Sequence, residues 1–206
     1  MTHQRTQSWG ETGKPPSLSD RLGVWLSAKQ IERTIGPMGG KDVADVGCGF
    51  NATFSSTLIP TVRSLHLADL AISPALKAQP TVTAYEGRLP EVLDRVGDAS
   101  LDRIICNNVL EHLWEPESVV RHFRRMLRPG GACFVNVPSW RGRIFLETSA
   151  FRLGTTAKSE IDDHKRYYER RDLWELMVRG GFLPSELKVR SHKFGLNTYA
   201  VARVEG

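Results

Sequence analysis

The stretch DVADVGCGFNATF, residues 42–54, is the most informative part of the sequence because it joins a short apolar run to a turn of small residues. Gly47 and Gly49 follow the apolar run directly, where they let the backbone turn tightly and bring its amides close to a ligand. The pattern nearly matches the dinucleotide-binding fingerprint G-x-G-x-x-G, but Asn51 and Ala52 stand where further glycines are expected. A nicotinamide dinucleotide is therefore not the automatic interpretation of this turn.

Strand-like and helix-like segments alternate along the chain. The apolar runs predict strands at Val43–Val46, Ser64–Ala68, Val82–Tyr85, Leu101–Cys106 and Ala132–Val137. Helices are predicted from Asp20 to Ile35, from the glycine turn to about Ile59, and over Pro116–Leu127. Asp20 or Ser19 is the expected N-cap of the first helix. A breaking turn follows the third helix at Arg128–Gly131. Crossovers of helix length imply a mainly parallel sheet with helices on both faces, a Rossmann-like three-layer α/β sandwich. Ligands of such sheets bind at the carboxyl ends of the strands.

The C-terminal part adds a different arrangement. A helix is predicted from about Arg171 to Arg179, where Gly180 and Gly181 stop it. Two strands, Leu187–Arg190 and Asn197–Arg203, are separated only by turn-length residues. They are expected to pair as an antiparallel hairpin on one edge of the sheet.

Composition bounds the class of protein. The 206 residues, 40% of them hydrophobic, suit a single domain, and a net charge of +5 makes anionic ligands or nucleic acid plausible partners. The three cysteines form no C-x-x-C pair, which fits a reducing compartment. No apolar run approaches the ~20 residues of a spanning helix and no secretory signal is visible, so a cytoplasmic protein is expected.

Two acids beside the glycine turn indicate the ligand. Asp45 precedes the glycines, where a carboxylate repels a polyphosphate but attracts a cation such as the α-ammonium of an amino acid. Asp69 ends the second strand, about 20 residues beyond Gly49, where an acid accepts hydrogen bonds from ribose hydroxyls. S-adenosylmethionine carries both a ribose and an ammonium group, and it has no phosphate.

Four segments carry a resemblance to the class I S-adenosylmethionine-dependent methyltransferases, and in particular to the group that methylates ubiquinone, menaquinone and other small molecules. They are VADVGCG, LHLADL, LDRIICNNVLEHLWEPESVVRHFRRMLRPGG and HKRYYERRDLWELMVRGGF, within residues 41 to about 182. The resemblance implies a seven-stranded sheet that ends in the reversed hairpin. The spacing between VLEHL and LRPGG makes it specific.

The resemblance also implies a set of cofactor contacts. The methionine part of S-adenosylmethionine would lie on Asp45, Gly47, Cys48 and Gly49, the ribose on Asp69, the adenine between Leu70 and the stretch Gly87-Arg88-Leu89, and Asn107 would contact the cofactor through its backbone. Many relatives place an Asp beside the adenine amino group. This chain offers Glu86, Arg88 and only later Asp98 there, so the adenine contact stays open.

The whole chain is expected to form one domain with five segments. These are a mobile arm at residues 1–19, with Trp9 as its only large apolar group, an N-terminal helix at 20–36, a cofactor-binding core at 41–138, a lid insertion at 139–165, and a C-terminal helix and hairpin at 166–206.

His164 and His112 are the catalytic candidates, because histidine titrates near neutrality and can act as a general base. His164 could equally be a hydrogen-bonded hinge of the lid, and in the resembling families the segment with Glu111 and His112 mostly orients a loop. Asp163, like its neighbour Asp162, is interpreted as a solvated loop charge. Trp140, Arg141 and Arg143 follow the fifth strand and are the candidates for substrate contact. No metal is expected.

The best hypothesis is an S-adenosylmethionine-dependent methyltransferase that transfers a methyl group directly to a small molecule, with oxygen preferred as the acceptor atom. The alternatives are an RNA or protein methyltransferase that works with a partner, a non-catalytic S-adenosylmethionine-binding module, and a nicotinamide oxidoreductase. Nucleic acid is disfavoured as a substrate because the basic residues are spread over the chain and no recognition domain is evident. The chain could be a monomer or a homodimer.

Overall fold

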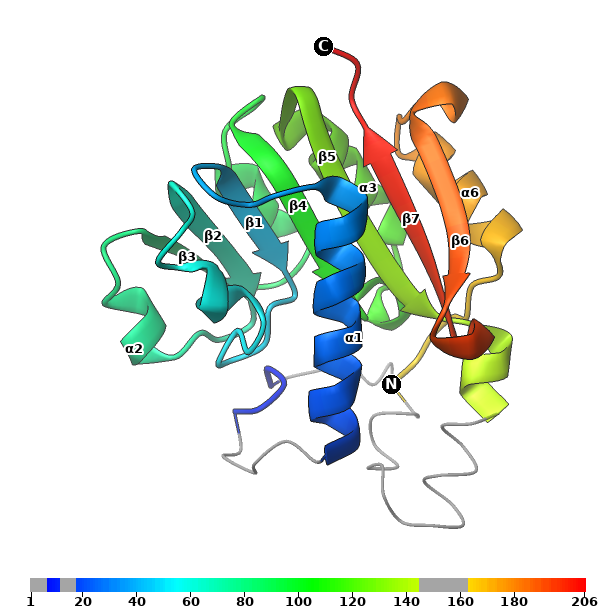
Figure 1. Ribbon diagram of the computed structural model, residues 1–206, viewed down its shortest axis with the longest axis horizontal. Coiled ribbons are helices and arrows are strands. Elements are labelled where there is room, and N and C mark those ends of the chain that lie inside the picture. The colour runs from blue at the N-terminus through cyan, green and yellow to red at the C-terminus, as the bar shows by residue number, and fades with distance from the viewer. Residues whose placement is uncertain (1–6, 12–17, 145–162) are drawn as a thin grey trace.

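The computed structural model describes residues 7–11, 18–144 and 163–206, and its centre is a seven-stranded sheet (Figure 1). The strands are β1 Asp42–Val46, β2 Ser64–Asp69, β3 Val82–Glu86, β4 Leu101–Asn107, β5 Leu127–Pro138, β6 Leu187–His192 and β7 Asn197–Arg203. Their order is β3-β2-β1-β4-β5-β7-β6, with parallel pairing from β3 to β5 and antiparallel pairing of β7 with both β5 and β6. The predicted fold class, a mainly parallel Rossmann-like sheet that ends in an antiparallel hairpin, is confirmed.

The strand order reverses at the centre of the sheet, between β1 and β4. The chain moves outward from β1 through β2 to β3, and then returns to the other side of β1 for β4 and β5. Ligands of doubly wound sheets bind at the carboxyl ends of the strands where the order reverses. The glycine turn follows β1 and the asparagines follow β4, so the fold brings both predicted site segments to this place.

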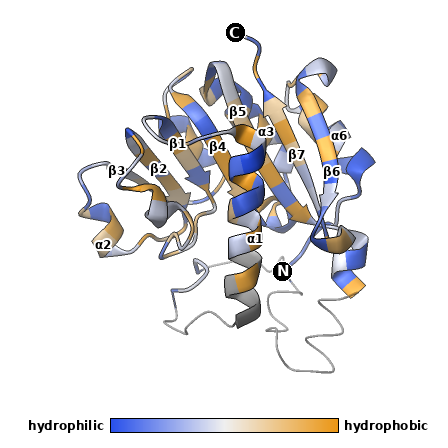
Figure 2. Ribbon diagram, viewed as in Figure 1, coloured by the Kyte–Doolittle hydropathy of each residue, from blue (hydrophilic) through white to orange (hydrophobic). Residues whose placement is uncertain are grey.

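Helices cover both faces of the sheet (Figure 1). The helix α1 Leu18–Ile35 crosses one face of the sheet and packs against β5. The helices α3 Pro116–Met126 and α6 Arg170–Arg179 lie on the opposite face, and the short helix α2 Pro74–Lys77 lies beside β3. Two clusters of buried side chains result. Ile31 and Ile35 of α1 belong to one cluster, and Phe123 of α3 and Met177 of α6 belong to the other. Figure 2 shows hydrophobic residues along β5 and β7, between these two layers.

The helix predicted from the glycine turn to Ile59 is wrong. That segment holds only a 3-10 helix, η1 Ser55–Leu58. Ala52 has a positive φ of 42°, which is outside the right-handed helical region, and several Ser and Thr residues follow it. Ser and Thr side chains compete for backbone hydrogen bonds and so weaken a helix.

Two predicted boundaries also differ. The helix α1 begins at Leu18, so the predicted cap positions, Ser19 and Asp20, lie inside it. Helix ends are difficult to place from sequence to within one or two residues. The predicted breaking turn Arg128–Gly131 lies within β5, which begins at Leu127, and the register against β4 shifts there. A strand can bulge in this way without leaving its sheet.

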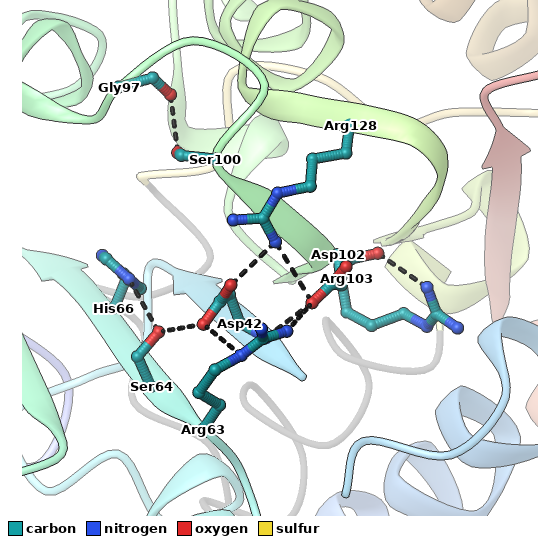
Figure 3. Close-up of polar contacts among 9 residues, drawn as sticks. All are labelled: Asp42, Arg63, Ser64, His66, Gly97, Ser100, Asp102, Arg103 and Arg128. Carbon is teal, nitrogen blue, oxygen red and sulfur yellow. Dashed lines mark hydrogen bonds and ion pairs between the residues drawn. The ribbon is translucent and has the colours of Figure 1, made fainter. Parts of the chain in front are cut away.

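Four charged side chains meet at the amino ends of the central strands (Figure 3). We call Asp42, Arg63, Asp102 and Arg128 the amino-edge cluster. Arg128 Nη1 lies 2.7 Å from an Asp42 oxygen and 3.3 Å from an Asp102 oxygen, and Arg63 contacts each carboxylate at 3.1 Å. Each carboxylate therefore meets two guanidinium groups.

In the part of the chain that the structure describes, no helix combines the length and the apolar character needed to cross a bilayer.

Candidate functional site

The turn after β1 depends on its glycines. Gly47 and Gly49 have φ values of 77° and 74°, in the left-handed region that favours glycine. The Gly47 amide donates to the Ala68 carbonyl at 2.7 Å, which holds the turn against the end of β2. A Cβ atom on Gly47 would lie only 2.1 Å from Val109 Cγ2. The backbone conformation and the contact with Val109 both require glycine at position 47.

Asp69 joins the end of β2 to the glycine turn. Its Oδ2 accepts from the Gly49 amide at 2.7 Å, and its Oδ1 accepts from the Leu70 amide at 2.7 Å. The Ser8 hydroxyl donates to the same Oδ1 at 2.5 Å and accepts from the Ala71 amide at 2.7 Å. The carboxylate is thus oriented to receive a hydroxyl donor, which is the chemistry that a ribose hydroxyl requires. The residues present fit the ribose of S-adenosylmethionine.

Residues 7–11 lie over this turn. The Trp9 carbonyl accepts from the Phe50 amide at 2.9 Å, and a Cβ on Gly49 would lie 3.3 Å from the Trp9 ring. Ser8 is buried. The rest of the predicted mobile arm falls partly outside the described residues. Sequence reasoning missed the contact between Ser8 and Asp69, and Trp9 was the only signal that the arm packs against the fold.

Asp45 lies beneath the turn and is buried. The Ser55 hydroxyl donates to its Oδ2 at 2.6 Å. Burial raises the pKa of Asp45 to about 7, and the nearby negative charge of Asp69 raises it further. The hydrogen bond from Ser55 acts in the opposite direction but does not outweigh burial. Burial likewise raises the pKa of Cys48 well above its usual value, so Cys48 is a neutral thiol at pH 7.

The adenine side of the predicted site is built around β3. The Gly87 amide donates to the Asp69 carbonyl at 3.0 Å, which places Gly87 and the adjoining Arg88 beside the Asp69–Leu70 segment. Glu86 accepts from the Ile72 amide at 2.8 Å and forms an ion pair with Lys77. Asp98 is instead paired with Arg125 of α3 and precedes β4, so it lies at the other edge of the sheet.

Three asparagines meet at the carboxyl ends of β4 and β5. The buried Asn136 amide donates to Asn107 Oδ1 at 2.9 Å and to Asn108 Oδ1 at 3.1 Å. Asn108 has a positive φ of 56°, which Asn tolerates better than most residues, and its amide donates to the Asn136 carbonyl at 2.8 Å. Asn136 was missed from the sequence because it sits within a run that predicts only a core strand.

The two catalytic candidates come together. The ring centroids of His112 and His164 are 4.8 Å apart, although 52 residues separate them in the chain. His112 belongs to the 3-10 helix η3 Leu110–His112 directly after β4, and the Lys165 amide donates to the Glu111 carbonyl at 2.7 Å. The chain from Asp163 onward therefore runs beside η3.

The interpretation of Asp163 as a solvated loop charge is wrong. Its side chain is only 15% exposed, its Oδ2 lies 3.0 Å from His112 Nδ1, and its Oδ1 lies 2.7 Å from Lys165 Nζ. Its neighbour Asp162 lies outside the described residues. The pairing was invisible in the sequence because it depends on the return of the chain after the predicted lid, whose residues 145–162 are not described.

A cavity of about 1000 Å³ opens beside these histidines, with Trp114, Trp140, Arg143, His164, Lys165 and Tyr167 among its lining residues. The Arg143 guanidinium lies 5.3 Å from the Trp140 ring and 5.8 Å from the Tyr167 ring. Of the three predicted substrate contacts, Trp140 and Arg143 therefore line one cavity. Arg141 is not among its described lining residues, and its guanidinium lies near Gly195 instead.

The sequence and the fold are both similar to those of known methyltransferases. Residues 44–135 match a family described as "Methyltransferase domain". The chain is 28% identical over 128 residues to a probable S-adenosylmethionine-dependent methyltransferase of Mycolicibacterium smegmatis, covering 60% of this chain and 49% of that protein. It is 31% identical over 118 residues to a ubiquinone biosynthesis O-methyltransferase of Paracidovorax citrulli, covering 54% and 50%. The chain thus spans about half the length of these curated relatives.

Among solved structures, the fold is similar to that of a chain in the Haloferax volcanii complex between the Trm112 methyltransferase activator and a methyltransferase. The TM-score is 0.70 at 14% identity, and the match covers 100% of both chains. Similarity at this identity concerns the fold alone. Taken with the family match and the sequence relatives, it shows that residues 44–135 are similar to the methyltransferase domain of S-adenosylmethionine-dependent methyltransferases.

Proposed function

We propose that this protein methylates a hydroxyl group of a small molecule and uses S-adenosylmethionine as the methyl donor. The observation that carries the proposal is the meeting of His112, His164 and Asp163 beside an aromatic cavity, next to the end of β4. A hydroxyl acceptor must lose its proton during methyl transfer, and imidazoles are suited to promote that loss near neutral pH.

The cofactor would lie along the glycine turn and the end of β2. We assign its methionine part to Asp45, Gly47, Cys48 and Gly49, its ribose to Asp69, its adenine to Leu70, Gly87 and Arg88, and a further backbone contact to Asn107. Support comes from the Asp69 carboxylate, which already accepts a hydrogen bond from the Ser8 hydroxyl. A ribose hydroxyl would take the place of Ser8, so residues 7–11 would move when the cofactor enters.

When bound, the cofactor supplies an electrophilic methyl group on a sulfonium. The chain contributes alignment, exclusion of water and proton removal. Trp140 and Tyr167, with ring centroids 5.4 Å apart, would hold an aromatic acceptor, and Arg143 and Lys165 would attract an anionic group on it. The name of the Paracidovorax citrulli relative, an O-methyltransferase of ubiquinone biosynthesis, supports oxygen as the acceptor atom.

A labelled-methyl assay tests the proposal. The purified chain is incubated with S-adenosylmethionine that carries a labelled methyl group and a panel of phenols and catechols with and without a carboxylate. We expect methyl ethers, with carboxylated acceptors preferred, and mass spectrometry to locate the methyl group on oxygen. Label found only on nitrogen or carbon atoms would contradict hydroxyl methylation.

Cofactor assignment is tested by Asp69→Ala, with Asp98→Ala as the matched control from the opposite edge of the sheet. Loss of the ribose hydrogen bond is expected to weaken binding of S-adenosylhomocysteine by about 1–3 kcal/mol in isothermal titration. The control is expected to bind as the unmodified protein does. Equal affinities for all three proteins would remove Asp69 from the cofactor site.

A second candidate function is methylation of RNA or protein with the help of a partner chain. The similarity to a chain of the Haloferax volcanii complex with a methyltransferase activator favours it. The same assay separates the candidates, because RNA and protein fractions of a cell extract can replace the small acceptors. The second candidate would be supported if label entered only RNA or protein, and if this transfer required unfractionated extract as a source of the partner chain.

A further inference from the structure

Glu111, His112 and His164 each present one ligand atom, and these three atoms lie within 4.8 Å of one another. Ligands bound at about 2.1 Å to a tetrahedral ion lie about 3.4 Å apart, so these atoms must approach one another by up to about 1.4 Å, which side-chain rotation can supply. We propose that these three residues bind a divalent first-row transition-metal ion, a site that the sequence analysis did not expect.

The backbone holds the three residues in place. Glu111 and His112 are consecutive in η3, and Glu111 is buried. The segment that carries His164 is tied to η3 because the Lys165 amide donates to the Glu111 carbonyl at 2.7 Å. Ligands fixed by two joined segments lose little conformational freedom when an ion binds.

Asp163 strengthens the case for a cation. Its Oδ2 lies 3.0 Å from His112 Nδ1, a contact that suits either a neighbouring ligand of the same ion or a carboxylate that orients a metal-binding imidazole. The cluster combines the carboxylates of Glu111 and Asp163 with one ammonium group, Lys165, which lies 2.7 Å from Asp163. With neutral imidazoles, these five side chains carry a net charge of −1 that favours a cation, and the guanidinium groups of Arg143 and Arg166 line the adjoining cavity.

The donor set selects the kind of metal. Two imidazoles and a carboxylate suit Zn²⁺, Mn²⁺, Co²⁺ or Fe²⁺, whereas Mg²⁺ and Ca²⁺ prefer oxygen ligands. Three protein ligands leave coordination positions for water or substrate, as in catalytic sites. His164 also lines the aromatic cavity, so those positions would be reached from the place assigned to the acceptor.

The role of the ion rests on the proposed function. In this role His112 and His164 promote proton loss as ligands of the ion and not as bases: the ion would lower the pKa of the acceptor hydroxyl, and the hydroxyl proton would pass to solvent water. The acceptor oxygen then forms a bond to the methyl carbon as the carbon–sulfur bond breaks, and that electron pair stays on sulfur. The products are a methyl ether, S-adenosylhomocysteine and a proton.

Metal binding is tested without cofactor or acceptor. The full chain is stripped with EDTA, dialysed and titrated with Co²⁺, with calorimetry for stoichiometry and visible absorption for coordination. We expect one Co²⁺ per chain, and at least tenfold weaker binding in His164→Ala and in Glu111→Gln. His122→Ala is the matched control, because His122 also lies beside a carboxylate, 3.6 Å from Asp94, but on α3.

The site is overturned if Co²⁺ does not bind stoichiometrically, or if His164→Ala and His122→Ala bind it equally well. Should Glu111→Gln fail to fold, as judged by circular dichroism, His164→Ala decides the result. The role in methyl transfer has a separate readout: the rate should fall in the stripped protein and return when Co²⁺ or Zn²⁺ is added. Full activity in stripped protein would overturn that role and leave the proposed function standing.

Discussion

The two ends of the same central strands treat their carboxylates differently. At the amino edge, Asp42 and Asp102 each meet two guanidinium groups (Figure 3). At the carboxyl edge, Asp45 of the same strand β1 receives a hydroxyl from Ser55, and Asp163 meets His112. Strand β1 therefore carries two acids three residues apart: Asp42 is paired with arginine, whereas Asp45 is hydrogen-bonded to Ser55.

The pKa values follow from this difference. Burial alone would raise the pKa of Asp42 and Asp102, but both pKa values are lowered. At Asp42, hydrogen bonds from Arg128 and Ser64 outweigh burial. At Asp102, a hydrogen bond from the Asp42 amide and the charge of Arg128 outweigh it. Burial dominates at Asp45 and raises its pKa to about 7. The amino edge keeps its acids ionised by pairing them with arginine, whereas the carboxyl edge keeps one acid, Asp45, whose pKa is about 7.

The largest effect is expected at the glycine turn. Gly47→Ala combines left-handed strain of about 1–2 kcal/mol with overpacking against Val109 of about 1–3 kcal/mol. We expect denaturant unfolding to show a loss on the order of 3 kcal/mol. The control is Gly40→Ala before β1, where φ is 66° and no atom lies within 4 Å of the new Cβ. Equal losses in both variants would mean that Val109 does not crowd the turn.

Asp45→Asn tests the raised pKa. An acid whose folded pKa exceeds its usual value of 3.8 contributes stability that is fully present below pH 3.8 and is lost as pH rises through about 7. That difference corresponds to at most about 4 kcal/mol, and we expect about half of it. Between pH 5 and pH 8 the unmodified protein should therefore lose stability that Asp45→Asn retains. Parallel pH profiles would show that Asp45 is not titrating.

The same acid makes cofactor binding depend on pH. If the cofactor ammonium pairs with Asp45, binding of S-adenosylhomocysteine should tighten as pH rises from 6 to 8 and should release a proton below pH 7. Calorimetry in buffers of different ionisation enthalpy measures that proton. Binding without proton release would place the ammonium elsewhere.

Asp42→Asn tests the opposite edge. A lowered pKa means that the stability from Asp42 is present above pH 3.8 and is lost as pH falls below that value. We expect a loss of about 1.5 kcal/mol at pH 7 that shrinks as pH falls below 3.8, with cofactor affinity unchanged. A change in affinity would mean that the two edges are coupled.

The smallest effect is expected at Ser8. Because its hydroxyl competes with a ribose hydroxyl for Asp69, Ser8→Ala should tighten S-adenosylhomocysteine binding by up to about fivefold, or about 1 kcal/mol. Ser100→Ala, which removes a hydroxyl bonded to the Gly97 carbonyl, is the control. Weaker binding in Ser8→Ala would show that residues 7–11 support the cofactor and do not compete with it.

Local signals located most of the sheet. Apolar runs marked all seven strands, and the short interval between the last two predicted their antiparallel pairing. Gly47 and Gly49 were recognisable because a left-handed turn tolerates few other residues. The helix predicted to Ile59 failed because Ala52, at φ 42°, is outside the helical region and the Ser and Thr residues after it weaken a helix.

Local sequence patterns were enough to place the strands along the chain, the glycine turn and the acids beside it, because these depend on backbone preference and on alternation over a few residues. The meeting of distant groups required the folded chain: Ser8 with Asp69, Asn136 with Asn107, and Asp163 with His112. Such pairs form where the chain returns to a strand end after a long excursion. Their geometry depends on the packing of the whole sheet, which no local pattern records.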